Sequence, residues 1–304
     1  MTVVEWLLDS DPSIRWQVMR DLTDKPDDVV AAERSRVASE GWGARLLERQ
    51  TPDGQWGESG YTRYIDTPDG KACHALMLLR DMGLDPASGK ARRAVGRVRD
   101  HITLYEGGQP FFEGEVEPCI NGRLLNLGAY FGEPCEAVLE RLLGEQLEDG
   151  GWNCEAPPSV RSSFHSTICV LEGLLEYERA KGATPAVTAA RARGEAYLLE
   201  RRMFRKLSSG EVINRDWTRY SFPPGYHYDV LRGLDYLRSA GVEPDDRIAE
   251  ATLLVQKTRR SDGRWLSHPH ADVLDFDMAE RADEASRWNT LRALRVLNWA
   301  SHRG

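Results

Sequence analysis

The sequence predicts an all-α fold in which inner and outer helices alternate around one closed ring, and two observations support this. The first is an internal repeat, because Gln50, Gln146 and Gln256 each end a helical stretch that an Asp-Gly turn and a Trp follow. Internal repeats of this kind are typical of folds that stack one structural unit many times. The second is an alternation of helical segments: some are rich in small and apolar residues, others in Arg and Glu, as buried inner and solvated outer helices would be.

The residue types of the repeat indicate that its role is structural. In the middle copy, QLEDGGW, Gly150 is expected to adopt the left-handed conformation that ends the preceding helix. Trp152 is a large apolar side chain that can cover the end of a neighbouring helix, although its indole N–H needs an acceptor. Gln146 can bond free carbonyls at the helix end or reach the next repeat. None of these roles is catalytic.

The helices are expected in the following order. Pro12 suits a first helical turn and starts a helix that runs to Leu22, Asp27 starts a second helix, and Gly41 starts a third that ends at Gln50. Apolar helices then cover 71–82, 118–131, 163–181, 226–239 and 285–300, and charged helices cover 89–101, 134–147, 186–202 and 246–257. Residues 103–117 and 203–225 are long non-helical insertions, which are often functional. Residues 1–40 complete the ring and 41–300 hold the repeats, so 1–304 forms one domain.

Composition narrows the class of protein. The 304 residues carry a net charge of −8 without a long basic run, so nucleic acid is not an expected partner. The N-terminus lacks the pattern of a signal peptide, and no segment approaches about 18 uninterrupted apolar residues, so no membrane span is expected. Five irregularly spaced cysteines fit a reduced, cytoplasmic protein better than a disulfide framework.

The repeated Gln-x-x-Asp-Gly-x-Trp phrase, with a small and apolar helix after it, resembles the QW-type repeat of squalene cyclases and of protein prenyltransferase β subunits. The resemblance covers most of residues 41–300. It implies an (α/α)6 toroid around a central cavity, and an enzyme that acts on an isoprenoid or other apolar substrate by prenyl transfer or by cyclisation. The alternative is a non-catalytic toroid that binds an apolar ligand or a protein partner.

The starts of the inner helices should surround one mouth of such a ring. Aligned on their shared apolar pattern, they bring polar groups above an aromatic wall, which is the usual form of a small-molecule site. The predicted substrate-binding residues are Cys73, Asn121, Arg161, Trp217, Tyr220, Tyr228 and Trp288. Arg161, with Arg219 and Arg287, could also receive the phosphates of an isoprenoid diphosphate, because Arg binds phosphate bidentately. Capping of nearby carboxylates is the other explanation for these arginines.

The prenyltransferase side of the resemblance implies a zinc ion. In that family an Asp-x-Cys pair at the start of one inner helix and a His at the start of another hold the metal, and Glu117-Pro118-Cys119 and His165 resemble these elements. Glu replaces Asp, and His165 lies one residue earlier than the family's ligand would. Glu117, Cys119 and His165 would leave a fourth position open, as a catalytic zinc needs. Cys73, His74 and Cys154 are possible substitutes among the ligands.

The cyclase side of the resemblance implies a protonating Asp in a D-x-D-D-T-A run at the start of an inner helix. The equivalent stretch, around Thr167, lacks every carboxylate, whereas Asp275-Phe276-Asp277 resembles half of that motif. Solvated carboxylates before a helix are common without catalysis. The predicted catalytic residues are therefore His165, which could act as a general base, Asp229 and Asp277.

Overall fold

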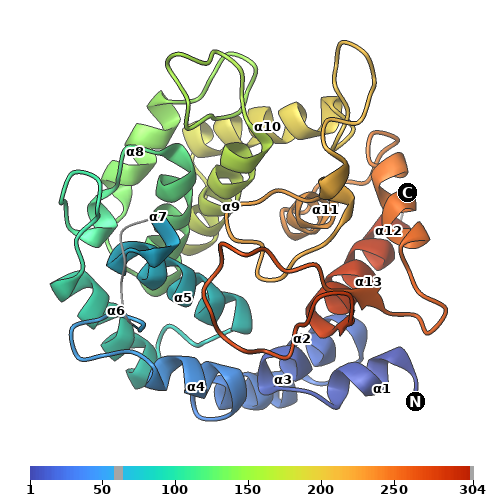
Figure 1. Ribbon diagram of the computed structural model, residues 1–304, viewed down its shortest axis with the longest axis horizontal. Coiled ribbons are helices and arrows are strands. Elements are labelled where there is room, and N and C mark those ends of the chain that lie inside the picture. The colour runs from blue at the N-terminus through green and yellow to red at the C-terminus, as the bar shows by residue number, and fades with distance from the viewer. Residues whose placement is uncertain (58–63, 302–304) are drawn as a thin grey trace.

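The computed structural model describes residues 1–57 and 64–301, and there the chain forms a ring of helices (Figure 1). An inner layer surrounds the centre, and an outer layer covers its outside. The inner helices are α2 (Pro12–Leu22), α5 (Pro68–Met82), α7 (Pro118–Phe131), α9 (Phe164–Lys181), α11 (Val230–Ser239) and α13 (Arg287–Ser301). The outer helices are α1 (Val3–Leu8), α3 (Asp27–Ser35), α4 (Gly41–Glu48), α6 (Gly89–His101), α8 (Glu136–Gly144), α10 (Pro185–Glu200) and α12 (Ala249–Lys257). The predicted all-α fold is confirmed.

The other regular elements are short. The 3₁₀ turns are η1 (Arg36–Ala38), η2 (Tyr64–Asp66), η3 (Phe111–Glu113) and η4 (Arg215–Thr218). The strands β1 (Trp265–Leu266) and β2 (Ala285–Ser286) pair antiparallel and form the one sheet of the described residues. The segment between these strands, drawn in orange to red, runs across the middle of the ring. None of the helices in the described part of the chain is long and apolar enough to cross a lipid bilayer.

Local residue types set the helix boundaries. Pro12 and Pro118 each occupy the first turn of a helix, where the missing N–H costs no hydrogen bond. One inner helix begins later than predicted, at Val230 rather than at 226. Asp229 caps it, because its carboxylate accepts a hydrogen bond from the amide of Arg232 at 2.7 Å. Residues 226–228 are therefore free to contribute side chains to the mouth of the ring.

The three Trp side chains of the repeat have one structural role. Each is buried, and each indole N–H donates to the backbone carbonyl ten residues earlier, at the end of the preceding outer helix. The pairs are Trp56 with Leu46 at 2.9 Å, Trp152 with Leu142 at 2.7 Å, and Trp265 with Val255 at 2.8 Å. The indole thus satisfies a carbonyl that the helix leaves free.

The Gln side chains of the first two copies and the turn glycines of all three copies also behave as expected. Gln50 donates to the carbonyl of Ala94 at 2.9 Å, and Gln146 donates to that of Ala190 at 2.8 Å, so each reaches the next outer helix. The turn glycines are in the left-handed region, with φ of +85° at Gly54, +97° at Gly150 and +80° at Gly263. The repeat therefore connects and ends helices, which is a structural role.

The inner helices α7 and α9 run parallel. Gly122 in α7 lies against the backbone of Cys169 in α9, and Asn126, one turn later, donates to the carbonyl of Glu172 at 3.0 Å. A parallel inner layer places helix N-termini at one mouth of the ring and C-termini at the other. The two mouths consequently differ in electrostatic character.

Helix C-termini surround a charged cavity of about 310 Å³ that takes residues from the ends of α5, α9 and α11. Its arginines are Arg20, Arg34, Arg80, Arg179, Arg232, Arg238, Arg292 and Arg295. Some bind helix-end carbonyls, as Arg34 binds that of Gly83 at 2.9 Å. Others form ion pairs, such as Arg232 with Glu172 at 2.7 Å. Because helix C-termini carry partial negative charge, these arginines are explained by fold stability.

Candidate functional site

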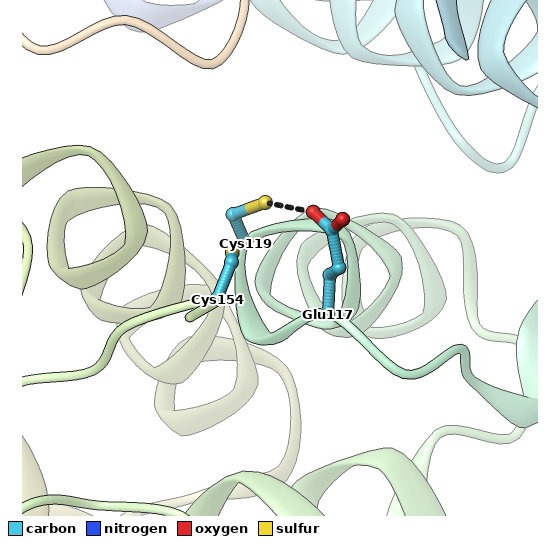
Figure 2. Close-up of side chains that lie close together, drawn as sticks. All are labelled: Glu117, Cys119 and Cys154. Atoms are coloured by element: carbon cyan, nitrogen blue, oxygen red, sulfur yellow. Dashed lines mark hydrogen bonds between the residues drawn. The ribbon is translucent and has the colours of Figure 1, made fainter. Parts of the chain in front are cut away.

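Three side chains that can bind a metal meet at the opposite mouth, where α7 begins (Figure 2). The ligand atoms of Glu117, Cys119 and Cys154 all lie within 4.8 Å of one another. The thiol of Cys119 points toward Glu117 and donates to its Oε2 at 3.4 Å. Pro118, the first residue of α7, separates the two and stiffens the backbone between them. A carboxylate and two thiols thus converge from two separate segments of the chain.

Cys154 reaches this place because the turn after Trp152 folds back onto the start of α9. The amide of Ser163 donates to the carbonyl of Trp152 at 2.8 Å, which closes the loop between them. The hydroxyl of Ser166 accepts from the amide of Cys154 at 3.3 Å and lies 3.2 Å from its Sγ. The thiol is therefore held in position by α9.

The two thiols differ in acidity. A hydrogen bond to Cys154 and burial raise the pKa of the Cys119 thiol, whereas the same hydrogen bond lowers the pKa of Cys154. Cys154 is consequently the thiol that ionises first. The thiolate is the form that binds a metal or attacks an electrophile.

His165 does not join this group, which corrects the predicted set of zinc ligands. Among the described residues, it belongs to no cluster of three or more metal-binding side chains within 4.8 Å. Its Nδ1 accepts a hydrogen bond from the amide of Tyr228 at 2.9 Å. Because an amide only donates, the proton of the neutral ring lies on Nε2, and neither nitrogen is free for a metal. Cys154 occupies the place expected of His165.

A cavity of about 420 Å³ lies at the start of α9. Ser166 contacts Cys154, and the preceding residue, His165, lines the cavity. Four of the seven histidines of the chain line it: His165, His227, His268 and His270. The lining also includes Asn214, Asp216, Trp217, Arg219, Tyr228 and Asp283. Most of these side chains are polar, so the cavity favours a substrate with a polar or charged end.

The four aromatic residues predicted at the mouth do not all lie together. Trp217 and Tyr228 line the cavity together with His165, but Tyr220 and Trp288 are not part of its lining. Trp288 instead stacks on Phe222 with ring centroids 4.0 Å apart and faces the arginine-lined cavity. Tyr220 is buried. The inner-helix alignment located these residues along the chain but did not determine which side chains face one cavity.

Two further predicted substrate-binding residues are fully buried. Cys73 lies inside α5, where its sulfur accepts a hydrogen bond from the hydroxyl of Tyr226 at 3.8 Å. The amide of Asn121 accepts from the backbone N–H of Glu115 at 2.7 Å and donates to its carbonyl at 2.6 Å. Neither side chain lines the cavity beside His165. Asn121 anchors the segment that precedes the metal-binding side chains.

The remaining predicted residues also lie outside the lining of this cavity. Burial raises the pKa of Asp229, which caps α11. Asp277 is exposed, and its carboxylate accepts from the amide of Ala279 at 2.8 Å. Arg161 is exposed, and its carbonyl accepts from the side chain of Asn153 at 2.7 Å. These hydrogen bonds give Asp229 and Asp277 structural roles and provide no support for a catalytic one.

A second group at the same mouth was missed by the sequence reasoning. His227, His270 and Asp272 have ligand atoms within 4.8 Å of one another. The sequence signals only part of it, since residues 268–272 read His-Pro-His-Ala-Asp and contain His270 and Asp272 but not His227. Two imidazoles and a carboxylate within five residues are typical of a metal-binding segment.

Comparison with known proteins gives distant overlaps. No family model and no curated protein matches the chain. A crystal structure of a protein from Actinoplanes overlaps 96% of this chain and 90% of that chain, with 18% identity and a TM-score of 0.46. The type II terpene cyclase MstE from Scytonema overlaps 94% of this chain and 86% of that chain, with 15% identity and a TM-score of 0.48. A variant of MstE in complex with its substrate, geranylgeranyl dihydroxybenzoate, has 16% identity and a TM-score of 0.47, over 95% of this chain and 86% of that chain. Overlaps this distant assign neither a family nor a reaction to this chain.

The stability of the metal-free protein should fall as the pH is lowered from about 6.5 toward 4. Burial, aided by the charges of His227 and Arg232, lowers the pKa of His165 to about 4. An unfolded His titrates near 6.5, so between these values the unfolded chain binds the proton and folding loses stability. One imidazole contributes at most about 1.4 kcal/mol per pH unit, and partial exposure reduces this.

Urea unfolding followed by circular dichroism at pH 7, 6 and 5 measures the effect. His165→Gln keeps an acceptor for the amide of Tyr228 but does not titrate. Its unfolding free energy should decline less steeply with falling pH than that of the wild type. Equal slopes for the two proteins would show that His165 titrates normally.

Proposed function

We propose that the protein is a zinc-dependent transferase that activates a thiol at this mouth of the ring and alkylates it with an isoprenoid or similar group. The observation that supports this most is the convergence of Glu117, Cys119 and Cys154. Ligands in a tetrahedral zinc site, at bond lengths of about 2.0–2.3 Å, lie about 3.3–3.8 Å apart. Cys119 Sγ and Glu117 Oε2 are already 3.4 Å apart. This distance, and the 4.8 Å within which all three ligand atoms lie, support the binding of one ion.

Zinc bound by two thiolates and one carboxylate would carry a net charge of about −1 and keep a fourth coordination position open. A thiol of the substrate could bind there, and the zinc would lower the pKa of that thiol. The protein's own residues support the same chemistry. Cys154 is the more acidic thiol of the pair and is oriented by Ser166. Both features favour a preformed set of ligands rather than one assembled by the metal alone.

The cavity at the start of α9 fits the other substrate. Trp217 and Tyr228 provide aromatic surface for an apolar chain. Arg219 also lines the cavity, and the proton of His165 lies on Nε2. Both groups can donate hydrogen bonds to an anionic leaving group such as a diphosphate. A donor with an apolar chain and an anionic end therefore agrees with the lining.

The proposal is tested with zinc-loaded protein, farnesyl diphosphate and a cysteine-containing peptide. The wild type should form a thioether that mass spectrometry detects. Cys154→Ser, and wild type treated with a chelator, should lose at least about 100-fold of this activity, as expected when a catalytic metal site is disrupted. His101→Ala, a change at the exposed end of α6, serves as the control and should keep full activity.

Two outcomes contradict the transferase. One is thioether formation that survives the loss of Cys154 and of the metal. The other is a zinc-loaded protein that binds the diphosphate but transfers nothing, which favours the alternative of a non-catalytic ring that binds a ligand.

A further inference from the structure

A second group of metal-binding side chains includes two residues that line the histidine-rich cavity, His227 and His270. His227 precedes α11, whereas His270 and Asp272 belong to the segment between β1 and β2 that crosses the ring (Figure 1). His227 Nε2 lies 2.8 and 2.9 Å from the two carboxylate oxygens of Asp272. The ring of His270 stacks on that of His227, with centroids 3.9 Å apart and planes 29° apart. The segment before α11 and the segment between β1 and β2 thus meet through side chains that can bind a metal.

An ion pair between His227 and Asp272 explains their contact but not the position of His270. His227 and Asp272 would form a normal hydrogen-bonded pair, but that pair gives no reason for a second imidazole stacked on the first. Two protonated rings at this distance would repel each other. A neutral imidazole keeps one nitrogen lone pair, so a second ring beside His227 adds a second potential ligand.

His270 also has an unsatisfied nitrogen. Its Nε2 is buried and has no hydrogen-bond partner among the described residues. A buried polar atom without a partner costs about 1–3 kcal/mol, so such atoms usually mark a missing ligand, water or ion. The charged carboxylate of Asp272 lies in the same group. A cation is the ligand that satisfies a lone pair and a negative charge together.

We propose that His227, His270 and Asp272 bind a divalent transition-metal ion, separate from the one assigned to Glu117, Cys119 and Cys154. Two imidazoles and a carboxylate suit Zn²⁺, Co²⁺, Mn²⁺ and Fe²⁺, and leave coordination positions free. His227 and His270 line the cavity, so these positions can face a substrate. The ion would fasten the segment between β1 and β2 to the segment before α11, and so hold this mouth of the ring in shape.

Equilibrium dialysis against Zn²⁺ with metal analysis tests the site, because the two groups can be removed separately. The wild type should bind two ions per chain. His270→Ala should bind one, with affinity at the lost site reduced by more than about 100-fold, since loss of a ligand exceeds the 10–100-fold effect of losing its supporting partner. Cys154→Ser should lose the other ion. His268→Ala, which changes a lining histidine outside the group, should still bind two.

Cobalt-loaded protein identifies which site is filled. A thiolate-to-cobalt absorption band should persist in His270→Ala and vanish in Cys119→Ser/Cys154→Ser. Asp272→Asn gives a second variant at a half-exposed position, should His270→Ala fail to fold. Zinc binding by His270→Ala and Asp272→Asn equal to that of the wild type overturns this proposal whatever the cysteines do. A single ion that depends on His270 alone supports it and contradicts the zinc transferase.

Discussion

Replacing Gly122 by Ala is expected to destabilise the protein by about 3 kcal/mol, because it would force apart two inner helices. A Cβ at this position would lie 2.6 Å from the backbone carbon and oxygen of Cys169 in α9. Gly173 faces it, and a Cβ there would lie 2.3 Å from the carbonyl oxygen of Gly122. The atoms that would have to move belong to helix backbone, which cannot shift as a flexible side chain can.

Gly96→Ala is the matched control. Gly96 lies within α6, and the nearest atom to its added Cβ is a terminal nitrogen of Arg99 at 3.6 Å. The same substitution should stabilise this helix by about 0.5–1 kcal/mol, since Gly is a poor helix former. Urea unfolding of both variants should therefore give changes of opposite sign. Equal changes would mean that α7 and α9 are not in backbone contact at Gly122.

Arg232→Met should be the most destabilising change of a charged residue near the site, at about 3–5 kcal/mol. Arg232 is 3% exposed and binds both carboxylate oxygens of Glu172, at 2.8 and 2.7 Å. It also donates to the carbonyl of His227 at 2.7 Å, which holds the segment before α11. Removing the guanidinium leaves the largely buried carboxylate of Glu172 unpaired. It also releases the segment around His227, which lines the candidate cavity.

Two further variants test whether the unpaired carboxylate causes this loss of stability. Arg247→Met removes an exposed pair with Asp245 and should cost less than about 1 kcal/mol. Adding Glu172→Gln to Arg232→Met should recover part of the loss, because the unpaired charge disappears. Chemical denaturation of the three variants measures both effects. An Arg232→Met variant as stable as Arg247→Met would show that the buried pair contributes nothing.

The fold was predictable because its signals are local. Pro12, Pro118 and the repeated Asp-Gly-x-Trp turns mark helix ends without reference to the rest of the chain. The short helix α1 was missed, although Thr2 and Glu5 form a capping box that the sequence displays. Expectations based on single turns and helical periodicity thus hold where one segment determines its own structure.

The site was less predictable because it depends on how loops return to the ring. Glu117 and Cys119 share one helix start and were found together. Cys154 replaces His165 because the Trp152–Ser163 contact folds a loop back onto α9, which no periodicity encodes. The pairing of His227 with Asp272 joins residues 45 positions apart. The sequence therefore indicates which segments carry metal-binding residues, but not which of these segments contact one another.

X-ray absorption at the zinc edge of the loaded protein tests the central claim most directly. Zinc on Glu117, Cys119 and Cys154 predicts sulfur scattering at about 2.3 Å together with oxygen or nitrogen at about 2.0–2.1 Å. Cys119→Ser/Cys154→Ser should lose the sulfur shell while its circular dichroism stays unchanged, because the repeat and not the ion holds the ring. Zinc-loaded wild type without a sulfur shell, or a reduced protein whose two cysteines bind no metal, would contradict the proposed zinc site.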